Sequence, residues 1–265
     1  MKIQHDLHIH TNLSACGQPE ATVERYVAEA KKIGLKLIGF ANHLWDDKIP
    51  GASRWYAPQN MQHILQIKNH IPKDEKDVRI LVGCETEFTH QGIMAISEES
   101  IAQLDYVLVP HSHTHSSCVV PREQIDSVEK HAAYLMSSFE NLIEHSLIKY
   151  VTGVVHPFVP GVSHELTNVI QKLIPDRYFY DVFSAAKEKN LPIEINGSTI
   201  ICMSEEERRN CEYLRIYSIA RECGCQFFYG SDNHDLIDRK LPIMESFFDQ
   251  CGITFDLLAP ICTPK

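Results

Sequence analysis

Short runs rich in β-branched and aromatic residues alternate with longer segments of helical periodicity along the whole chain. This alternation limits the fold more than any other feature, because it is typical of repeated β-strand and α-helix units around a parallel sheet or barrel. Seven strands are expected, at residues 3–9, 36–41, 79–84, 106–110, 150–155, 192–195 and 226–230. Helices are expected at residues 22–33, 58–71, 98–103, 122–145, 178–189, 205–223 and 241–250. Residues 158–175 are rich in loop signals and are expected to form an excursion over one face.

Length and composition favour one globular unit. A chain of 265 residues with 44% hydrophobic and 23% charged residues fits a single domain over residues 1–265. The formal charge of −10 argues against a nucleic-acid partner, which would require clustered basic residues. A polar amino terminus, no apolar run long enough to span a bilayer and nine scattered cysteines predict a cytoplasmic protein with reduced thiols and no membrane partner. The oligomeric state is left open.

The first expected strand carries two histidines, His8 and His10, in the stretch DLHIHT. Residues two apart on a strand point to the same side, so these rings lie roughly 6 to 7 Å apart at about 3.3 Å per residue. Such a pair can begin a metal site. Taken alone it is weak evidence, because an isolated strand histidine is more often an ordinary polar residue.

Similar side chains recur where other expected strands end. They are His43 after the second strand, Glu85 and Glu87 after the third, His111, His113 and His115 after the fourth, His156 after the fifth, and Asp232 and His234 after the seventh. Donors thus follow six of the seven expected strands. Barrels of β-strands and α-helices build their active sites at the carboxyl ends of the strands. The set as a whole therefore predicts a metal site there, although Glu87 alone is equally consistent with a solvated side chain.

These residues fall into short motifs. In chain order they are DLHIHT at residues 6–11, NH at 42–43, GCE at 83–85, the histidine cluster before Ser116, HPF from His156, EING from Glu194 and GSDNH at 230–234. In content and order the motifs resemble those of the PHP (polymerase and histidinol phosphatase) superfamily, in particular its histidinol-phosphatase-like members. The resemblance spans almost the whole chain. It is specific to the superfamily and much less specific to a substrate.

The resemblance implies a distorted seven-stranded (β/α)7 barrel of the TIM type, with two to three divalent zinc, manganese or iron ions in a phosphoesterase site. It assigns His8, His10, Glu85 and Asp232 to the first ion, Glu85, His113 and His156 to the second, and Cys16, His43 and His234 to the third. Glu85, Asp232 and His234 are also expected to act in catalysis. Asp6 is expected to orient a ligating imidazole through its other ring nitrogen.

Two residues depart from the family pattern. Asn42 stands where the family usually has aspartate before the histidine, and it brings no negative charge to the cluster. Cys16 stands where the family usually has histidine or aspartate. A thiolate is a softer ligand, so the third site is expected to prefer zinc or iron over manganese.

The expected reaction is hydrolysis of a small phosphomonoester, with histidinol phosphate as the first candidate substrate. A hydroxide bridging the metals would attack phosphorus in line, because clustered metals lower the pKa of bound water and stabilise charge on the phosphate. Arg54, Arg122 and Arg239 follow strand ends and are the candidate phosphate-binding residues, with Trp55 as a possible cover over the substrate. His113 is preferred over His111 and His115 as the ligand from its cluster.

Three other functions stay open at this point. An amidohydrolase-like enzyme acting on C–N bonds also begins with two histidines on a first barrel strand, but the Glu85 motif fits it poorly. A nuclease-type phosphodiesterase would require a basic groove, which an acidic chain does not favour. A non-catalytic metal-binding domain is disfavoured by the nearly complete ligand set.

Overall fold

The computed structural model describes residues 1–235 and 240–263. Its described residues form nine β-strands: β1 (His5–Ile9), β2 (Leu37–Phe40), β3 (His43–Leu44), β4 (Arg79–Val82), β5 (Cys84–Thr86), β6 (Val107–Pro110), β7 (Gly153–Val155), β8 (Ile193–Asn196) and β9 (Phe227–Gly230). All pairings between these strands are parallel. They make a three-stranded sheet, β1-β2-β4, and a six-stranded sheet, β3-β5-β6-β7-β8-β9. The predicted α/β class is therefore confirmed.

The two sheets meet where the strand predicted over residues 79–84 is interrupted. The chain from β4 to β5 breaks at Gly83, whose N–H donates to the Phe40 carbonyl at 2.9 Å. A side chain at residue 83 would put its Cβ 2.4 Å from the Tyr106 carbonyl oxygen, so only glycine fits there. The sheets also meet beyond the ends of β1 and β9, where His10 N–H donates to the Asn233 carbonyl at 2.8 Å. The assigned strands of the described residues thus form two sheets and not the single closed barrel that the family resemblance implied.

The described helices differ from the predicted ones mainly in where they begin and break. They are α1 (Val23–Ile33), α2 (Met61–Leu65), α3 (Ile67–His70), α4 (Glu98–Ile101), α5 (Val128–Ile143), α6 (His164–Lys172), α7 (Asp176–Glu188), α8 (Gly197–Ile200), α9 (Glu205–Asn210), α10 (Glu212–Glu222) and α11 (Leu241–Gln250). Short 3₁₀ turns occupy Arg122–Gln124, Ile148–Tyr150, Phe255–Leu257 and Pro260–Cys262. The segment predicted as one helix over residues 205–223 is divided at Cys211, whose backbone is extended.

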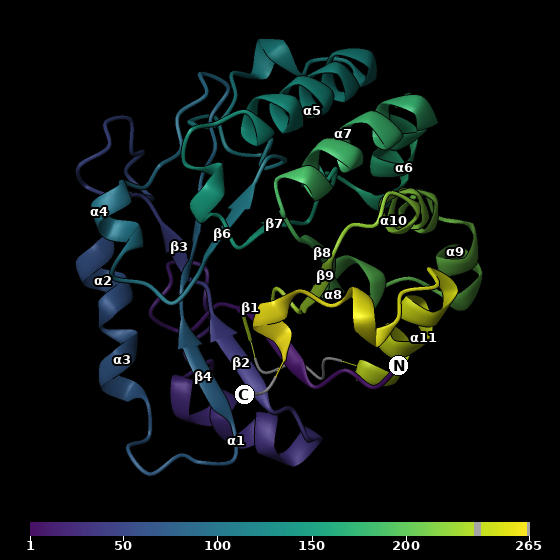
Figure 1. Cartoon of the computed structure of the whole chain (residues 1–265). Coiled ribbons are helices and arrows are strands. Elements are labelled where there is room, and N and C mark those ends of the chain that lie inside the picture. Colours follow the sequence, from purple (N-terminus) through teal and green to yellow (C-terminus); the bar gives the residue numbers. More distant parts are fainter. Residues whose placement is uncertain (236–239, 264–265) are drawn as a thin grey trace.

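Residues 158–175, which were expected to form an excursion over one face, contain the helix α6. Ser163 caps the helix by accepting a hydrogen bond from Leu166 N–H, and Ile170 is buried on its inner face. The helix begins at His164, and the loop signals before it, including Gly161, conceal its start. In Figure 1, α5, α6, α7 and α10 lie together on one side of the strands, while α2, α3 and α4 line another.

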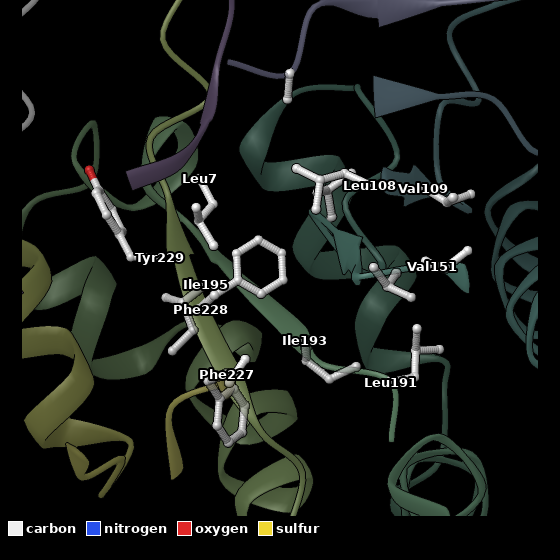
Figure 2. Close-up of a cluster of buried hydrophobic side chains, with 14 of the residues drawn as sticks. Leu7, Leu108, Val109, Val151, Leu191, Ile193, Ile195, Phe227, Phe228 and Tyr229 are labelled. Carbon is white, nitrogen blue, oxygen red and sulfur yellow. The ribbon is translucent and has the colours of Figure 1, made fainter. Parts of the chain in front are cut away.

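The hydrophobic core lies among the strands and beneath these helices. Leu7, Leu108, Ile195 and Phe228 gather there (Figure 2), and each is almost completely buried. No described helix combines the length and the apolar character needed to cross a membrane. The nine cysteines all lie in the described part of the chain, and each has a free thiol.

Candidate metal centre

Histidine, carboxylate and thiol groups converge at the carboxyl ends of the strands. Three sets of these residues each place their ligand atoms within 4.8 Å of one another. The first donor group is His8, His10 and Glu85, the second is Glu85, His113 and His156, and the third is His10, Cys16, His43 and His234. Because Glu85 and His10 each belong to two groups, the three groups form one continuous cluster.

Glu85, on β5, lies at the centre of the cluster. One carboxylate oxygen, Oε2, is 3.4 Å from Nε2 of both His8 and His10 and 3.0 Å from His43 Nδ1. The other, Oε1, is 2.8 Å from His156 Nε2 and 3.4 Å from His113 Nε2. Burial acts to raise the pKa of Glu85, but the positive charges of His43, His113 and His8 hold that pKa well below its usual range. The carboxylate is therefore ionised and available to bridge two cations.

Asp232 lies close to the first donor group from the segment after β9. Its Oδ1 is 3.4 Å from His10 Nε2 and 3.7 Å from His8 Nε2, which is compatible with the ligand role expected from the sequence. Asp232 has φ 54°, and His156 has φ 30°. Left-handed backbone is unfavourable for both residue types, and such conformations concentrate at functional sites. The ring of His234 stacks on that of His10 at 4.3 Å.

Three histidines use Nδ1 for a contact that orients the ring. His8 Nδ1 donates to Glu194 at 2.7 Å, His113 Nδ1 donates to Glu87 at 2.7 Å, and His156 Nδ1 donates to Ser112 Oγ at 3.1 Å. Each ring therefore directs Nε2 toward Glu85. Burial acts to lower the pKa of His8 and His113, but neighbouring carboxylates raise it, so the protonated rings pair with Glu85. Once a ring loses its Nε2 proton to become a ligand, it presents a lone pair to a carboxylate that also accepts. A bound cation would turn this unfavourable arrangement into a favourable one, and such outer contacts are typical of metal-ligating histidines.

Glu194 and Glu87 are therefore part of the site, although the sequence did not assign a role to Glu194. Glu194 also accepts a hydrogen bond from His156 N–H at 2.6 Å, and Glu87 accepts one from the Tyr56 hydroxyl. A carboxylate inside an otherwise apolar strand, PIEIN, was the signal for Glu194. For His8, the orienting role expected of Asp6 falls to Glu194, while Asp6 accepts from Ser231 N–H at 2.9 Å.

The third donor group contains Cys16, which is one of the two departures from the family pattern. The other departure, Asn42, directly precedes His43 of the same group. Burial acts to raise the pKa of Cys16, but hydrogen bonds from His10, His234 and His43 lower it to about 3, which favours the thiolate that binds metals. Asn42 holds the chain beside this group, because its side chain accepts from Thr11 N–H at 2.7 Å and donates to Thr11 Oγ1 at 2.9 Å.

The other two histidines of the fourth-strand cluster lie elsewhere. His111 is buried between the rings of Phe139 and Phe158, and its Nε2 accepts a hydrogen bond from Phe158 N–H at 2.9 Å. Burial lowers the pKa of His111 to about 3, so it stays neutral in the core. His115 is exposed, with its ring 5.0 Å from that of His113. Only His113 of the three joins a donor group among the described residues.

The predicted substrate residues lie at the edge of the cluster or outside the described residues. Arg54 is exposed, and the neighbouring Trp55 is 42% exposed with its ring 5.2 Å from that of His43. Arg122 is exposed and lines a cavity beside the second donor group. Arg239 lies outside the described residues.

The donor set fits divalent cations. Nδ1 of His10 is buried and has no hydrogen bond of ordinary geometry with any residue that the structure describes, and the Glu85 carboxylate is the neighbour of His43 Nδ1, at 3.0 Å. Leaving such groups unpaired costs free energy that a coordinated cation would offset. Imidazole, carboxylate and thiolate together suit zinc or iron, whereas the groups without Cys16 also suit manganese.

Comparison with known proteins identifies the family of this chain. Residues 6–198 match the PHP domain family. A probable phosphatase of Clostridium acetobutylicum is 28% identical over 235 residues, 88% of this chain and 80% of the relative. A probable phosphatase of Thermoanaerobacter sp. strain X514 is 28% identical over 261 residues, 97% of this chain and 90% of the relative. Among solved structures, the histidinol phosphate phosphatase of Lactococcus lactis, complexed with zinc, L-histidinol and phosphate, is similar with TM-score 0.62 and 15% identity, covering 95% of this chain and 94% of that one.

The structure is a parallel α/β scaffold whose strand ends carry a cluster of donor groups able to hold metal ions. The chain belongs to the PHP domain family, as its motifs predicted. The enzyme class predicted from the sequence, a phosphatase, is also the class of the named relatives. Asp232 and His234 lie beyond the matched residues, so their place in the site depends on the geometry described above.

Proposed function

We propose that this protein is a metal-dependent phosphatase that hydrolyses a small phosphomonoester, with histidinol phosphate as the first compound to test. The observation that carries the proposal is the single buried cluster in which Glu85 and His10 each belong to two donor groups. A phosphate group has several oxygens to neutralise at once, and adjacent cations accomplish this. The Lactococcus lactis enzyme of similar fold was solved with zinc and phosphate, which supports the same class of chemistry.

The residues of the chain supply the geometry for this reaction. Two to three bound divalent ions would lower the pKa of a coordinated water to about 7 and offset the phosphate charge. Glu85 holds the first and second donor groups together, and Asp232 contributes a second carboxylate on the side of His8 and His10. Glu194 and Glu87 prevent His8 and His113 from rotating. His234 lies at the partly exposed edge of the cluster, where a substrate would enter.

We also propose that Cys16 is a ligand in the third donor group. Its thiol lies on the loop after β1 beside three histidines, and those contacts favour the thiolate. Cys16→Ala is expected to remove about one metal equivalent and to lower turnover with little change in melting temperature. Cys16→His is expected to restore both. A Cys16→Ala protein with unchanged metal content and a lowered melting temperature would instead indicate a packing role.

The proposal extends to the whole described chain. We infer one domain over residues 1–265, supported by a hydrophobic core that contains residues from both ends of the described chain.

We also infer that the nine strands correspond to the seven strands of a distorted barrel, with β2 and β3 forming one of them and β4 and β5 another. Hydrogen bonds from Glu85 N–H to the Asn42 carbonyl at 3.1 Å and from Asp232 N–H to the His8 carbonyl at 2.8 Å continue the ladder where strand assignment stops.

The experiment compares three reaction classes with one protein preparation. Metal content is measured by elemental analysis, and hydrolysis is measured on histidinol phosphate, para-nitrophenyl phosphate, a dinucleotide and a hydantoin. Turnover of phosphomonoesters that is lost with a chelator and restored by zinc, manganese or iron is expected. Faster hydrolysis of the dinucleotide would favour the phosphodiesterase alternative, and hydrolysis of the hydantoin would favour the C–N hydrolase. Full activity in metal-free protein would contradict the proposal.

A further inference from the structure

A cavity of about 570 Å³ adjoins the second donor group. The loop after β6 and the first turn of α5 form one side, and the segment from β7 into α6 forms the other. These two loops follow β6 and β7, the strands that end near His113 and His156. Neither histidine lines the cavity, but the ring of His115, which does, is 5.0 Å from that of His113. The cavity therefore neighbours the second donor group.

Hydrogen bonds and a close contact keep the cavity walls in place. The Thr114 hydroxyl donates to the Pro160 carbonyl at 2.7 Å, and His131 Nε2 donates to Thr114 Oγ1 at 2.6 Å. Gly161 has φ +57°, and a Cβ there would lie 2.6 Å from His115 Nδ1. Only glycine allows the second loop to approach His115 this closely. The cavity is thus formed by the chain itself, as most small-molecule sites are.

The lining mixes apolar side chains with polar ones, which are Thr114, His115, Ser117, Ser127 and His131, and with the charged residues Asp126 and Arg122. Val120 and Ile170 are buried in its wall, and Leu166 adds an exposed apolar side chain. Asp126 is neutralised by Lys130, at 2.7 Å. Arg122 also lines the cavity, and it forms no ion pair with any residue that the structure describes. The cavity thus combines apolar walls with an arginine whose charge is not compensated.

We propose that this cavity binds the alcohol portion of the substrate, and that Arg122 selects phosphomonoesters with an anionic group at the far end of a short apolar chain. The inference rests on the proposed phosphatase function and narrows its substrate class. Arg122 presents several N–H donors in a planar fork that fits a carboxylate or a second phosphate. Apolar walls exclude water from the middle of the substrate. An ammonium group at the far end of the chain would be repelled by the guanidinium.

The test uses the metal-loaded enzyme and alkyl phosphates of three, five and seven carbons that end in methyl, carboxylate or ammonium. At the best chain length we expect kcat/KM for the carboxylate to exceed that for the methyl compound by about tenfold, the size of one hydrogen bond between charged groups. Arg122→Ala is expected to remove this preference, because kcat/KM for the carboxylate compound should fall by about tenfold more than kcat/KM for the methyl compound. Arg122→Glu is expected to favour the ammonium compound. Arg177→Ala, an exposed arginine on α7, is the matched control and should change nothing.

A second measurement separates this inference from the proposed function. Binding of the matching ω-hydroxy carboxylates is followed by calorimetry, which requires no turnover. Arg122-dependent binding in a protein that hydrolyses no phosphate would support the cavity assignment while the phosphatase proposal failed. Equal loss for all three end groups in Arg122→Ala would mean that Arg122 contacts the reacting phosphate, and the inference would be overturned. No end-group preference in the wild-type enzyme, together with no carboxylate binding, would overturn it as well.

Discussion

Strand β1 contributes to two buried regions of opposite chemistry. Alternate residues of a strand point to opposite faces, so Leu7 and Ile9 lie on one side and His8 and His10 on the other. All four side chains are completely buried. Leu7 joins the apolar core of Figure 2, where packing alone is favourable. The histidines join the metal centre, where carboxylates and unpaired ring nitrogens are favourable only with a bound cation. Although both regions are equally buried, mutations in the metal centre should affect metal content and turnover, and mutations in the apolar core should affect the free energy of unfolding.

The largest effect is expected from the centre of the metal site. Glu85→Gln removes the carboxylate shared by two donor groups, and turnover should fall by more than about 100-fold, the upper range for residues that only orient ligands. Metal content should fall with it. The metal-free protein should remain folded, because the amide has nearly the volume of the carboxylate and the surrounding imidazoles can lose their protons when the charge of Glu85 is removed. Elemental analysis and thermal melts check this, with chelator-treated wild-type protein as the control. A Glu85→Gln protein that keeps all its metal would contradict the shared-ligand assignment.

A substitution that creates a cavity in the apolar core should lower stability and leave metal binding and turnover unchanged. Phe228 on β9 is 1% exposed, and its ring packs against the backbone of Gly153. A Cβ added to Gly153 would lie 2.3 Å from the Phe228 ring. Phe228→Ala is expected to lower the free energy of unfolding by about 3 to 5 kcal/mol. The protein that stays folded should bind metal normally and retain its turnover per folded molecule. Urea denaturation and elemental analysis measure the two quantities. Loss of metal from folded protein would mean that the two regions are not independent.

A smaller effect is expected one contact away from the ligands. Glu87→Gln weakens the bond that holds His113, and activity should fall by about 10- to 100-fold. The chain offers a matched control, because the Tyr150 hydroxyl donates to Glu98 on the surface just as Tyr56 donates to Glu87 in the interior. Glu98→Gln should leave metal affinity and turnover unchanged. Similar losses in both variants would show that the effect is not specific to His113.

The smallest effect concerns a buried carboxylate that requires no cation. Burial acts to raise the pKa of Asp46, but hydrogen bonds from Ser100, Ser97 and the Lys48 backbone lower it to about 2. A folded-state pKa below the unfolded value of about 3.9 stabilises the fold above pH 4, and this contribution is lost as the pH falls toward 2. Asp46→Asn should therefore cost about 2 kcal/mol at pH 7 and progressively less below pH 4.

Urea denaturation of both proteins at several pH values measures the Asp46 contribution, with a chelator present throughout. The difference should not respond to the chelator, because Asp46 is satisfied by the protein's own donors. A difference that stays constant from pH 7 to pH 2 would show that the effect arises from packing and not from the charge. A difference that depends on metal would connect Asp46 to the metal centre.

Much of this protein was determined by local sequence. The seven runs of β-rich residues occur as strands within a few residues of their predicted positions, because apolar pattern and turn residues act over short distances. His8 and His10 share a face because strand geometry alone requires it. The family followed from motifs of a few adjacent residues, from Asp6 to His234. The predicted donor residues of all three groups lie close to one another in the structure, although their role as metal ligands stays a prediction.

Other features were decided only by tertiary structure. His111 and His113 are two residues apart, yet one packs against Phe139 in the core and the other faces Glu85. His10 belongs to the third donor group as well as the first. Glu194 contacts His8, although the two residues are 186 positions apart in the sequence. Spacing along one strand determines the face on which a side chain lies. Which groups meet across different strands depends on how loops and sheets pack, and no short stretch of sequence contains that information.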